Sequence, residues 1–324
     1  MKIISKKIFE NKNLLIAPFN TKLGLSLVST DMIKAQLNPN IHFKVIESLY
    51  KILHQDIVFP LMDVFLEANA INRISKSKNE KIFAENMYEW KKIKNDLYLQ
   101  NYLKTVELMA KTLPKKVIKG AFVTAPFTLA SIINGLKKTK NDVLVENDKF
   151  LSLINLLKKI SANLVENLIE VGADFICVLD PMASLLNSEN IQKFSLKSLN
   201  DITKICNRKN VISALHICGN ITPIIENIFS ANFDVLSIDS EDAGVNIAEI
   251  SKIIPENLVL MGNLNPKGKL FSGTSKEVES EVVKLLKSMK EKQNFILGTG
   301  CDLPKNTPLE NMISFVNSGR NFSK

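Results

Sequence analysis

Arginine is nearly absent from this sequence. Of its 42 lysine and arginine residues, only Arg73, Arg208 and Arg320 are arginines. Proteins favour arginine where a phosphate or carboxylate is recognised in a planar, bidentate way, and a nucleic-acid-binding surface normally gathers its basic residues on one face. A lysine-rich surface without arginine clusters or interleaved aromatics therefore argues against a nucleic-acid partner. Two explanations remain for the formal net charge of +9: a solvated basic surface, or attraction to an acidic partner or a small anionic substrate.

Cysteine and long apolar runs are also scarce. Four scattered cysteines among 324 residues do not resemble a disulfide framework, so a reducing, cytoplasmic setting is expected. No stretch approaches the roughly 18 consecutive apolar residues of a membrane span. The short apolar run 14–19 has no cleavage-like site behind it, so we expect neither a signal peptide nor a membrane partner.

A glycine-rich fingerprint after a strand is missing as well, which argues against an open nucleotide-binding sheet. Instead, the chain repeats a short apolar run, a polar turn and a longer amphipathic segment. The apolar runs lie at 14–19, 56–63, 117–126, 173–181, 211–219, 233–240, 257–266 and 294–302. Such runs, bounded by Gly, Pro, Asp or Asn, are typical of buried parallel strands.

The segments between these runs have a helical pattern, and one of them, 275–294, carries a capping signal at Thr274 or Ser275. Eight strand–helix units without a break in composition predict an α/β fold, a closed (β/α)8 TIM barrel that forms a single domain over residues 1–324. The charged segment 75–110, which contains the only tryptophan, Trp90, is longer than one crossover needs. We expect a helical insertion after the second strand, serving either as a lid or as plain decoration.

His216 and Cys218 lie two positions apart at the end of one predicted strand. By itself this spacing suits either a metal site or an apolar strand in which both residues are packed. In a TIM barrel, however, the carboxyl ends of all strands meet at one rim. Polar residues at these ends are Asp63, Thr124, Asp180, His216, Cys218, Asp239, Asn263 and Cys301.

Cys301 follows the last strand, so the barrel brings it to the rim with His216 and Cys218. One histidine and two cysteines with an open fourth position are typical of a catalytic zinc. Cys177, within a strand, and Cys206, within a helical pattern, are expected to be inert. Five other residues have plain alternatives. Asp180 would cap the following helix, Asp239 and Asn263 would satisfy loop amides, and Pro126 and Pro266 would serve turns.

Several stretches resemble the uroporphyrinogen decarboxylase superfamily. They are PLMDVFLEANAI, GAFVTAPFTLASIINGL, VGADFICVLDPMAS, LHICGN, VLSIDS, LVLMGNLNP and ILGTGCDLPKNTPLENM. The pairing of His-x-Cys after one strand with Cys after the last is similar to the zinc-dependent methylcobamide:coenzyme M methyltransferases of this superfamily. The decarboxylases fit less well. Their N-terminal arginine is missing from PFNTKLGLSLVST, and their Gly-His-Gly turn is replaced by Gly298, Thr299 and Gly300.

This resemblance implies a methyl transfer from a methylated corrinoid, carried by a separate corrinoid protein, to a small thiol such as coenzyme M. It implies that zinc, held by His216, Cys218 and Cys301, binds the acceptor thiol. We expect Asp63 and Asp180 to be catalytic. Asp239 and Asn263 are expected to contact the cofactor.

The acceptor's anionic group would be held by Lys22, Lys267 or a backbone amide. Two other functions stay open at this point. One is a metal-free decarboxylase or related lyase, and the other is a non-catalytic zinc- or corrinoid-binding accessory protein.

Overall fold

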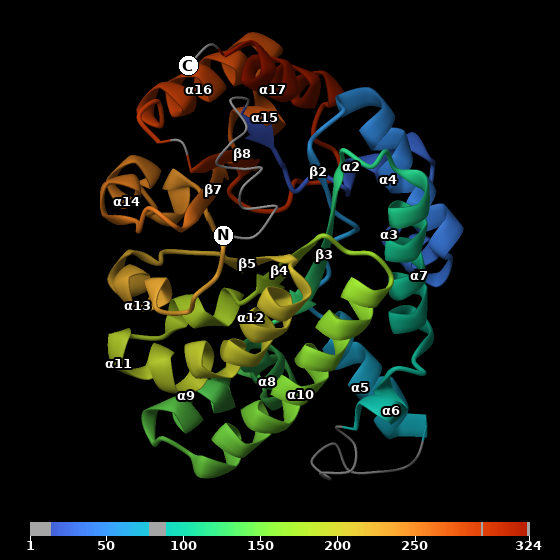
Figure 1. Cartoon of the computed structure of the whole chain (residues 1–324), viewed down its shortest axis with the longest axis vertical. Helices are drawn as coiled ribbons and strands as arrows, with labels where there is room; N and C mark the ends of the chain where they lie inside the picture. The colour runs from blue at the N-terminus through green and yellow to red at the C-terminus, as the bar shows by residue number, and fades with distance from the viewer. Residues whose placement is uncertain (1–13, 78–88, 293, 323–324) are drawn as a thin grey trace.

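The computed structural model of the chain describes residues 14–77, 89–292 and 294–322. Eight parallel strands follow one another around a sheet in the order β1-β8-β7-β6-β5-β4-β3-β2, surrounded by helices (Figure 1). The strands are β1 (Leu15–Ile16), β2 (Ile57–Val58), β3 (Ile118–Thr124), β4 (Phe175–Leu179), β5 (Ile212–Ile217), β6 (Val235–Ile238), β7 (Val259–Leu264) and β8 (Phe295–Thr299). Each lies inside one of the eight predicted apolar runs, and the predicted TIM barrel is confirmed.

Asp56, which lies directly before β2, links the first and second strands. Its N–H donates to Ile16 O (2.9 Å), and its carboxylate accepts the N–H of Ile16 (2.8 Å). The guanidinium of Arg320 donates to the same carboxylate (2.7 Å) and to the carbonyl oxygens of Leu14 and His54. Arg320 thereby ties together the segments that lead into β1 and β2, at the amino end of the barrel.

Each even-numbered strand is directly preceded by an aspartate or asparagine, and the side chain of this residue bonds to the backbone of the neighbouring odd-numbered strand or of the residue before it. The carboxylates of Asp56, Asp174 and Asp234 each accept a backbone N–H from the preceding odd-numbered strand, at 2.8, 3.1 and 2.7 Å. Asn294 instead donates its side-chain amide to Leu258 O (2.6 Å). We call these four residues the base clamps. They provide partners for backbone groups that would be costly to leave unpaired at the end of the sheet.

Phenylalanine fills the inside of the barrel. Phe59 stacks on Phe122 with ring centroids 4.9 Å apart and contacts Phe19 and Phe175 edge to face at 5.2 and 5.5 Å. These rings belong to a separate buried cluster that includes aliphatic residues from most strands. The barrel is therefore a packed core and not a pore, and polar groups at its mouth rest on an apolar floor.

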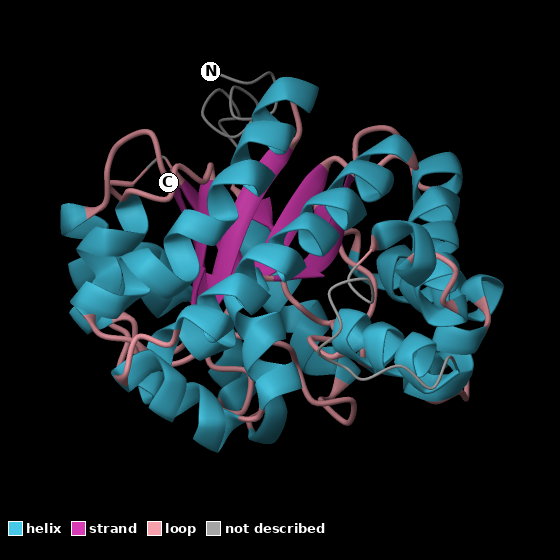
Figure 2. Ribbon diagram, turned by 90° about the horizontal axis from the view of Figure 1, so that it is seen from below, coloured by secondary structure: helices cyan, strands magenta, loops and turns pink. Residues whose placement is uncertain are grey.

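The helices form the outer layer, and in the view from below they lie on both sides of the sheet and in front of it (Figure 2). They are α2 (Leu23–Leu27), α3 (Met32–Leu37), α4 (Pro39–Leu53), α5 (Leu66–Ser77), α6 (Trp90–Ile93), α7 (Leu97–Thr112), α8 (Pro126–Asn134), α9 (Leu136–Leu144), α10 (Asp148–Glu170), α11 (Ser188–Ile191), α12 (Lys197–Lys209), α13 (Ile225–Phe229), α14 (Ile247–Ile253), α15 (Lys269–Ser272), α16 (Ser275–Ser288) and α17 (Leu309–Asn321). The predicted start of α16 is confirmed, because Thr274 forms a capping box with Glu277. Pro126 is the first residue of α8, and Pro266 lies in a turn.

The interval 75–110 is helical over most of its described part, which includes the end of α5, all of α6 and most of α7. Residues 78–88 of this interval lie outside the described residues. α7 packs directly on the barrel, since the hydroxyl of Tyr102 donates to Phe122 O (3.0 Å) and accepts the Phe122 N–H (2.7 Å). α7 is thus the last of the helices between β2 and β3, and it follows α5 and α6. A lid in the remainder of this interval stays a prediction.

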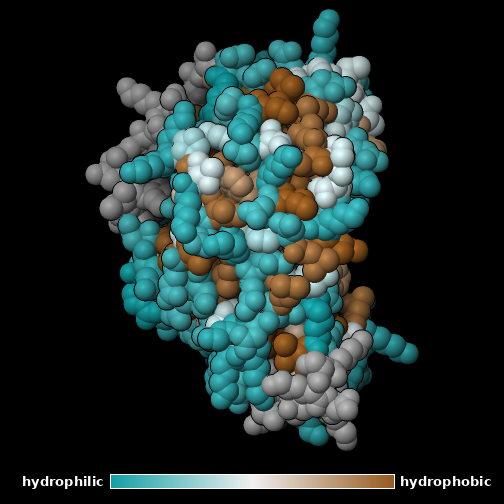
Figure 3. Space-filling model, turned by 90° about the vertical axis from the view of Figure 1, so that its right-hand side faces the viewer, coloured by the Kyte–Doolittle hydropathy of each residue, from teal (hydrophilic) through white to brown (hydrophobic). Residues whose placement is uncertain are grey.

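Apolar patches lie among hydrophilic residues on the surface, and Figure 3 shows them on one face of the molecule. Exposed apolar side chains on helices of this side include Leu27, Ile33, Leu37 and Leu97. In the described part of the chain, no helix has both the length and the apolarity needed to cross a bilayer.

Candidate metal centre

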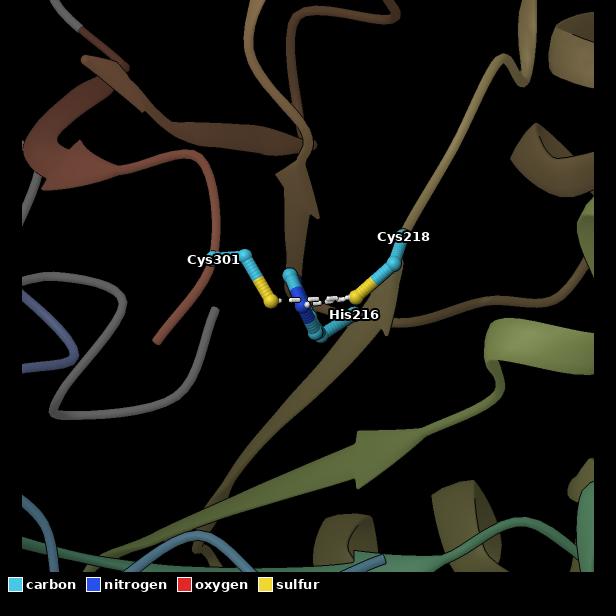
Figure 4. Close-up of side chains that lie close together, drawn as sticks. All are labelled: His216, Cys218 and Cys301. Atoms are coloured by element: carbon cyan, nitrogen blue, oxygen red, sulfur yellow. Dashed lines mark hydrogen bonds between the residues drawn. The ribbon is translucent and has the colours of Figure 1, made fainter. Parts of the chain in front are cut away.

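The three residues predicted to bind a metal lie together at the carboxyl ends of β5 and β8. His216 lies near the end of β5, Cys218 follows that strand directly, and Cys301 follows β8. His216 Nε2 is 3.1 Å from Cys218 Sγ, which is 3.2 Å from Cys301 Sγ. Figure 4 shows the two thiols pointing at each other from opposite sides, with the imidazole between them. The ligand atoms all lie within 4.8 Å of one another.

Two glycines let the chain bring these residues together. Gly219, after Cys218, has a φ of +95°, a conformation that favours glycine. Gly300, before Cys301, approaches the loop after β6 so closely that a Cβ would lie 2.5 Å from Ser240 N. Both glycines therefore set the paths of the loops that carry the two thiols.

This donor set fits a divalent soft or borderline metal. Around a tetrahedral zinc, with bonds of about 2.3 Å to sulfur and 2.0 Å to nitrogen, ligand atoms lie about 3.5 to 3.8 Å apart. The observed spacings of 3.1 and 3.2 Å need to lengthen only by about half an ångström to match. Three protein ligands leave a fourth position for a substrate. That these residues bind a metal remains a prediction.

His216 is held firmly from two directions. It is 1% exposed, and the edge-to-face contact with Phe19 has a centroid distance of 5.1 Å. On the far side of the ring, Nδ1 lies 3.0 Å from the hydroxyl of Ser237 on β6. The ring therefore presents Nε2 to the two thiols.

The contact between the two thiols shifts their pKa values in opposite directions. The contact with Cys218 lowers the pKa of Cys301 and the neighbouring His216 lowers it further, although burial opposes the shift. The same contact and burial raise the pKa of Cys218. The contact therefore favours the thiolate form at Cys301 over that at Cys218. Cys177 and Cys206 are both fully buried, and burial raises the pKa of Cys177.

Asp302 and Lys22 form an ion pair beside this cluster. Asp302 follows Cys301 directly, and its carboxylate lies 2.8 Å from Lys22 Nζ, at the start of α2. Burial raises the pKa of Asp302 to about 6, although Lys22 opposes the shift. Lys22 therefore lies close to Cys301, whereas Lys267 is exposed in the turn after β7.

Asp239 and Asn263 hold the loops around the cluster. One carboxylate oxygen of Asp239 accepts the N–H of Gly219 (2.8 Å) and the other accepts the N–H of Ser240 (2.7 Å). Asn263 donates its side-chain amide to Asp239 O (2.9 Å). The structure shows the loop-amide alternative for Asp239 and a backbone contact for Asn263. A direct contact of either residue with a cofactor remains a prediction.

The two predicted catalytic aspartates differ in their surroundings. Asp63, half-buried beyond β2, accepts Gln36 Nε2 (2.7 Å) and the N–H of Phe65 (2.9 Å). Asp180 is fully buried directly after β4, and it accepts the hydroxyls of Thr128 and Ser195, both at 2.5 Å.

The alternative role of Asp180 as a helix cap is not observed, because its side chain makes no capping bond to the 3-10 helix Pro181–Leu185. Burial raises its pKa to about 6. Both of its oxygens are already engaged, so its surroundings suit a structural role better than a catalytic one.

Three residues near the mouth were not singled out from the sequence: Ser237, Asp302 and Glu67. Glu67 is buried at the start of α5 and accepts the N–H (2.7 Å) and the hydroxyl (2.8 Å) of Thr124. Burial raises its pKa to about 7. In the sequence, each of these residues is marked only by its closeness to a predicted site residue. Glu67 comes four positions after Asp63, Asp302 directly follows Cys301, and Ser237 comes two positions before Asp239.

Almost the whole chain matches a known protein family. A family model described as uroporphyrinogen decarboxylase (URO-D) matches residues 26–322. The chain belongs to the URO-D family. The family predicted from the sequence motifs is thereby confirmed, and it extends over almost the whole barrel.

Members of the URO-D family with different activities resemble this chain. Methylcobamide:CoM methyltransferase MtbA from Methanosarcina mazei is 28% identical over 222 residues, 68% of this chain and 63% of that protein. A uroporphyrinogen decarboxylase from Prochlorococcus marinus is 26% identical over 211 residues, 63% of this chain and 58% of that protein. The matched part thus spans less than two thirds of the length of either relative. Among solved structures, a methyltransferase from Methanosarcina mazei matches with a TM-score of 0.82 at 17% identity, over 98% of this chain and 96% of that chain. This match shows the shared fold.

Proposed function

We propose that this URO-D family member is an enzyme that transfers a methyl group from a methylated corrinoid to a small thiol at a zinc centre. The observation that carries the proposal is the convergence of His216 Nε2, Cys218 Sγ and Cys301 Sγ at the mouth of the barrel. A decarboxylase has no need of this donor set. The similarity to a methylcobamide:CoM methyltransferase supports the same reaction class.

His216, Cys218 and Cys301 would hold the zinc, and the apolar floor of phenylalanines beneath them would exclude water. A bound zinc would attract a substrate thiol to its open position and favour the thiolate, which is the nucleophilic form. The two cysteinates balance the charge of a divalent ion, so the sulfur of the acceptor would keep its electron density. In the proposed reaction, the thiolate sulfur of the acceptor would form a bond to the methyl carbon. The carbon–cobalt(III) bond would break, and its electron pair would stay on cobalt, which becomes cobalt(I).

Other residues at the mouth would take supporting roles in this proposal. Asp63, which is half-buried whereas Asp180 is fully buried, would face the corrinoid. Asp180 and Asp239 would fix the loops. Lys22 is better placed than Lys267 to hold an anionic group of the acceptor, such as the sulfonate of coenzyme M, because it lies beside the Cys301 loop. That group would share Lys22 with Asp302. The corrinoid would be delivered by a separate corrinoid protein.

The experiment combines metal analysis with turnover. Protein purified without chelator should contain about one zinc per chain. With methylcobalamin and a panel of thiols, including coenzyme M and homocysteine, it should release cobalt(I) or its oxidised form cobalt(II), followed by absorbance, together with the methyl thioether. A zinc content near zero after supplementation, or no methyl transfer to any thiol by the zinc-loaded protein, would refute the proposal.

The decarboxylase function is the second candidate, because a uroporphyrinogen decarboxylase is among the similar proteins. The described residues 18–30 contain no arginine, and the corresponding segment of decarboxylases holds the substrate carboxylates. Incubation of the metal-free protein with uroporphyrinogen separates the two candidates. Release of carbon dioxide without metal would favour the decarboxylase.

A further inference from the structure

Ser237 is the neighbour of His216 across two strands of the barrel. The two residues are directly paired in the register of β5 and β6, and both side chains are buried, at 0% and 1% exposed. Ser237 Oγ lies 3.0 Å from His216 Nδ1. Because this contact is built into the strand pairing, it does not depend on a loop conformation.

A neutral imidazole carries one proton, and its position decides which nitrogen can bind a metal. For Nε2 to offer its lone pair to a metal between the thiols, the proton must be on Nδ1. There it can be donated to Ser237 Oγ. A hydroxyl can also act as the donor, however, and then Nε2–H would point at Cys218 Sγ, 3.1 Å away. Ser237 is therefore compatible with both the metal-bound and the metal-free form of the histidine.

We propose that Ser237 is a positioning residue, which accepts the Nδ1 proton of His216 so that Nε2 is oriented and available to bind the metal. This inference rests on the metal site of the proposed function. Histidine ligands generally need such an outer partner, and its removal typically lowers metal affinity 10- to 100-fold. A neutral hydroxyl fits here because a buried carboxylate would add a negative charge to a site that already contains two cysteines.

The test compares zinc affinities, measured by competition with a chromogenic chelator. Ser237→Ala should bind zinc roughly 10- to 100-fold more weakly than the wild type, whereas Ser237→Thr, which keeps the hydroxyl, should restore most of the affinity. Ser213→Ala is the matched control. Ser213 is also a fully buried serine, but its hydroxyl donates to Asp234 at the other end of β5 (2.7 Å), so this variant should bind zinc like the wild type.

A spectroscopic readout separates positioning from a general loss of structure. In the zinc-loaded wild type, NMR should detect a slowly exchanging proton on His216 Nδ1, and this proton should exchange quickly in Ser237→Ala and slowly in Ser237→Thr. If Ser237→Ala does not fold, Ser237→Cys, with a weaker acceptor, replaces it and should show an intermediate affinity. Zinc affinity within twofold of the wild type in the Ala variant, with the proton unchanged, would overturn the inference. A wild type that binds no zinc would instead overturn the proposed function.

Discussion

The backbone N–H of Gly219 donates to the carboxylate of Asp239 across a distance of 2.8 Å. This bond ties the loop that carries Cys218 to the end of β6, and the second carboxylate oxygen is held by Ser240 N–H. The position of the Cys218 thiol therefore depends on a residue that is not part of the His–Cys–Cys cluster.

Asp239→Ala should loosen this loop. The half-buried N–H of Gly219 would lose its partner, at a cost of about 1–2 kcal/mol in the free energy of unfolding, and zinc affinity should fall about 10-fold or more. Asp239→Asn should lie between the Ala variant and the wild type, because an amide has only one oxygen for two N–H donors. Chelator competition and urea unfolding measure these effects. Asp242→Ala, an exposed change after the same strand, is the control, and an equal loss of affinity in it would contradict the loop explanation.

Cys301→Ala should abolish methyl transfer from methylcobalamin and leave the barrel folded. The apolar core, and not a metal, stabilises a domain of this size, whereas small zinc modules unfold without their ion. The expected result is a melting temperature within a few degrees of the wild type together with background rates, assayed in excess zinc. Cys206→Ala, which removes a buried thiol on α12, should remain active. Unfolding of the Cys301 variant would indicate a structural metal, and full activity would exclude Cys301 as a ligand of the working metal.

The buried carboxyl of Glu67 should make stability depend on pH. Its pKa is raised by burial from 4.5 to about 7, so the folded state favours the protonated form. The stability associated with this group is complete below about pH 4.5 and is lost as the pH rises through 7. The shift corresponds to about 3 kcal/mol as an order of magnitude.

Glu67→Gln should remove this dependence. Its amide can donate to Thr124 Oγ1, which can still donate to Val64 O (3.1 Å). In urea unfolding, the variant should match the wild type at pH 5 and exceed it in stability at pH 8. Glu279→Gln, at an exposed position on α16, should change neither value. A variant no more stable than the wild type at pH 8 would show that the carboxylate is well accommodated.

Arg320 should stabilise the barrel without affecting the metal centre. Arg320→Ala removes three hydrogen bonds at the junction of β1 and β2, which should lower the free energy of unfolding by about 1–3 kcal/mol. Zinc affinity should not change. Arg208→Ala is the matched control, because its ion pair with Glu166 is largely exposed and should contribute under about 1 kcal/mol. Equal losses in both variants would argue against a special role of the junction.

The strands were predictable because a buried parallel strand needs a continuous apolar run, and this pattern is local in the sequence. The meeting of His216, Cys218 and Cys301 followed from the fold alone, since the carboxyl ends of all strands share one rim. Ser237 could not be found in this way. Its contact with His216 depends on the register of β5 and β6, which the sequence does not display.

The environments of carboxyl groups were equally hard to predict. Both Asp180 and Asp239 follow a strand, so their positions are alike in the sequence. The first is enclosed by hydroxyls from α8 and the π-helical segment Gln192–Leu196, and the second faces backbone N–H groups. Glu67 is buried because α5 begins against the end of β3. Each of these outcomes depends on contacts between segments that are distant along the chain.

The base clamps bear on which parts of this protein can be replaced without loss of the fold. All four lie at the amino ends of strands, and His216, Cys218 and Cys301 lie at the opposite ends. Different residues thus close the barrel and form the site at its mouth. We therefore expect loops after β5 and β8 to be exchangeable with those of relatives that run another reaction, while the strands keep their pairing. A scaffold divided in this way can acquire a new activity without first losing its fold.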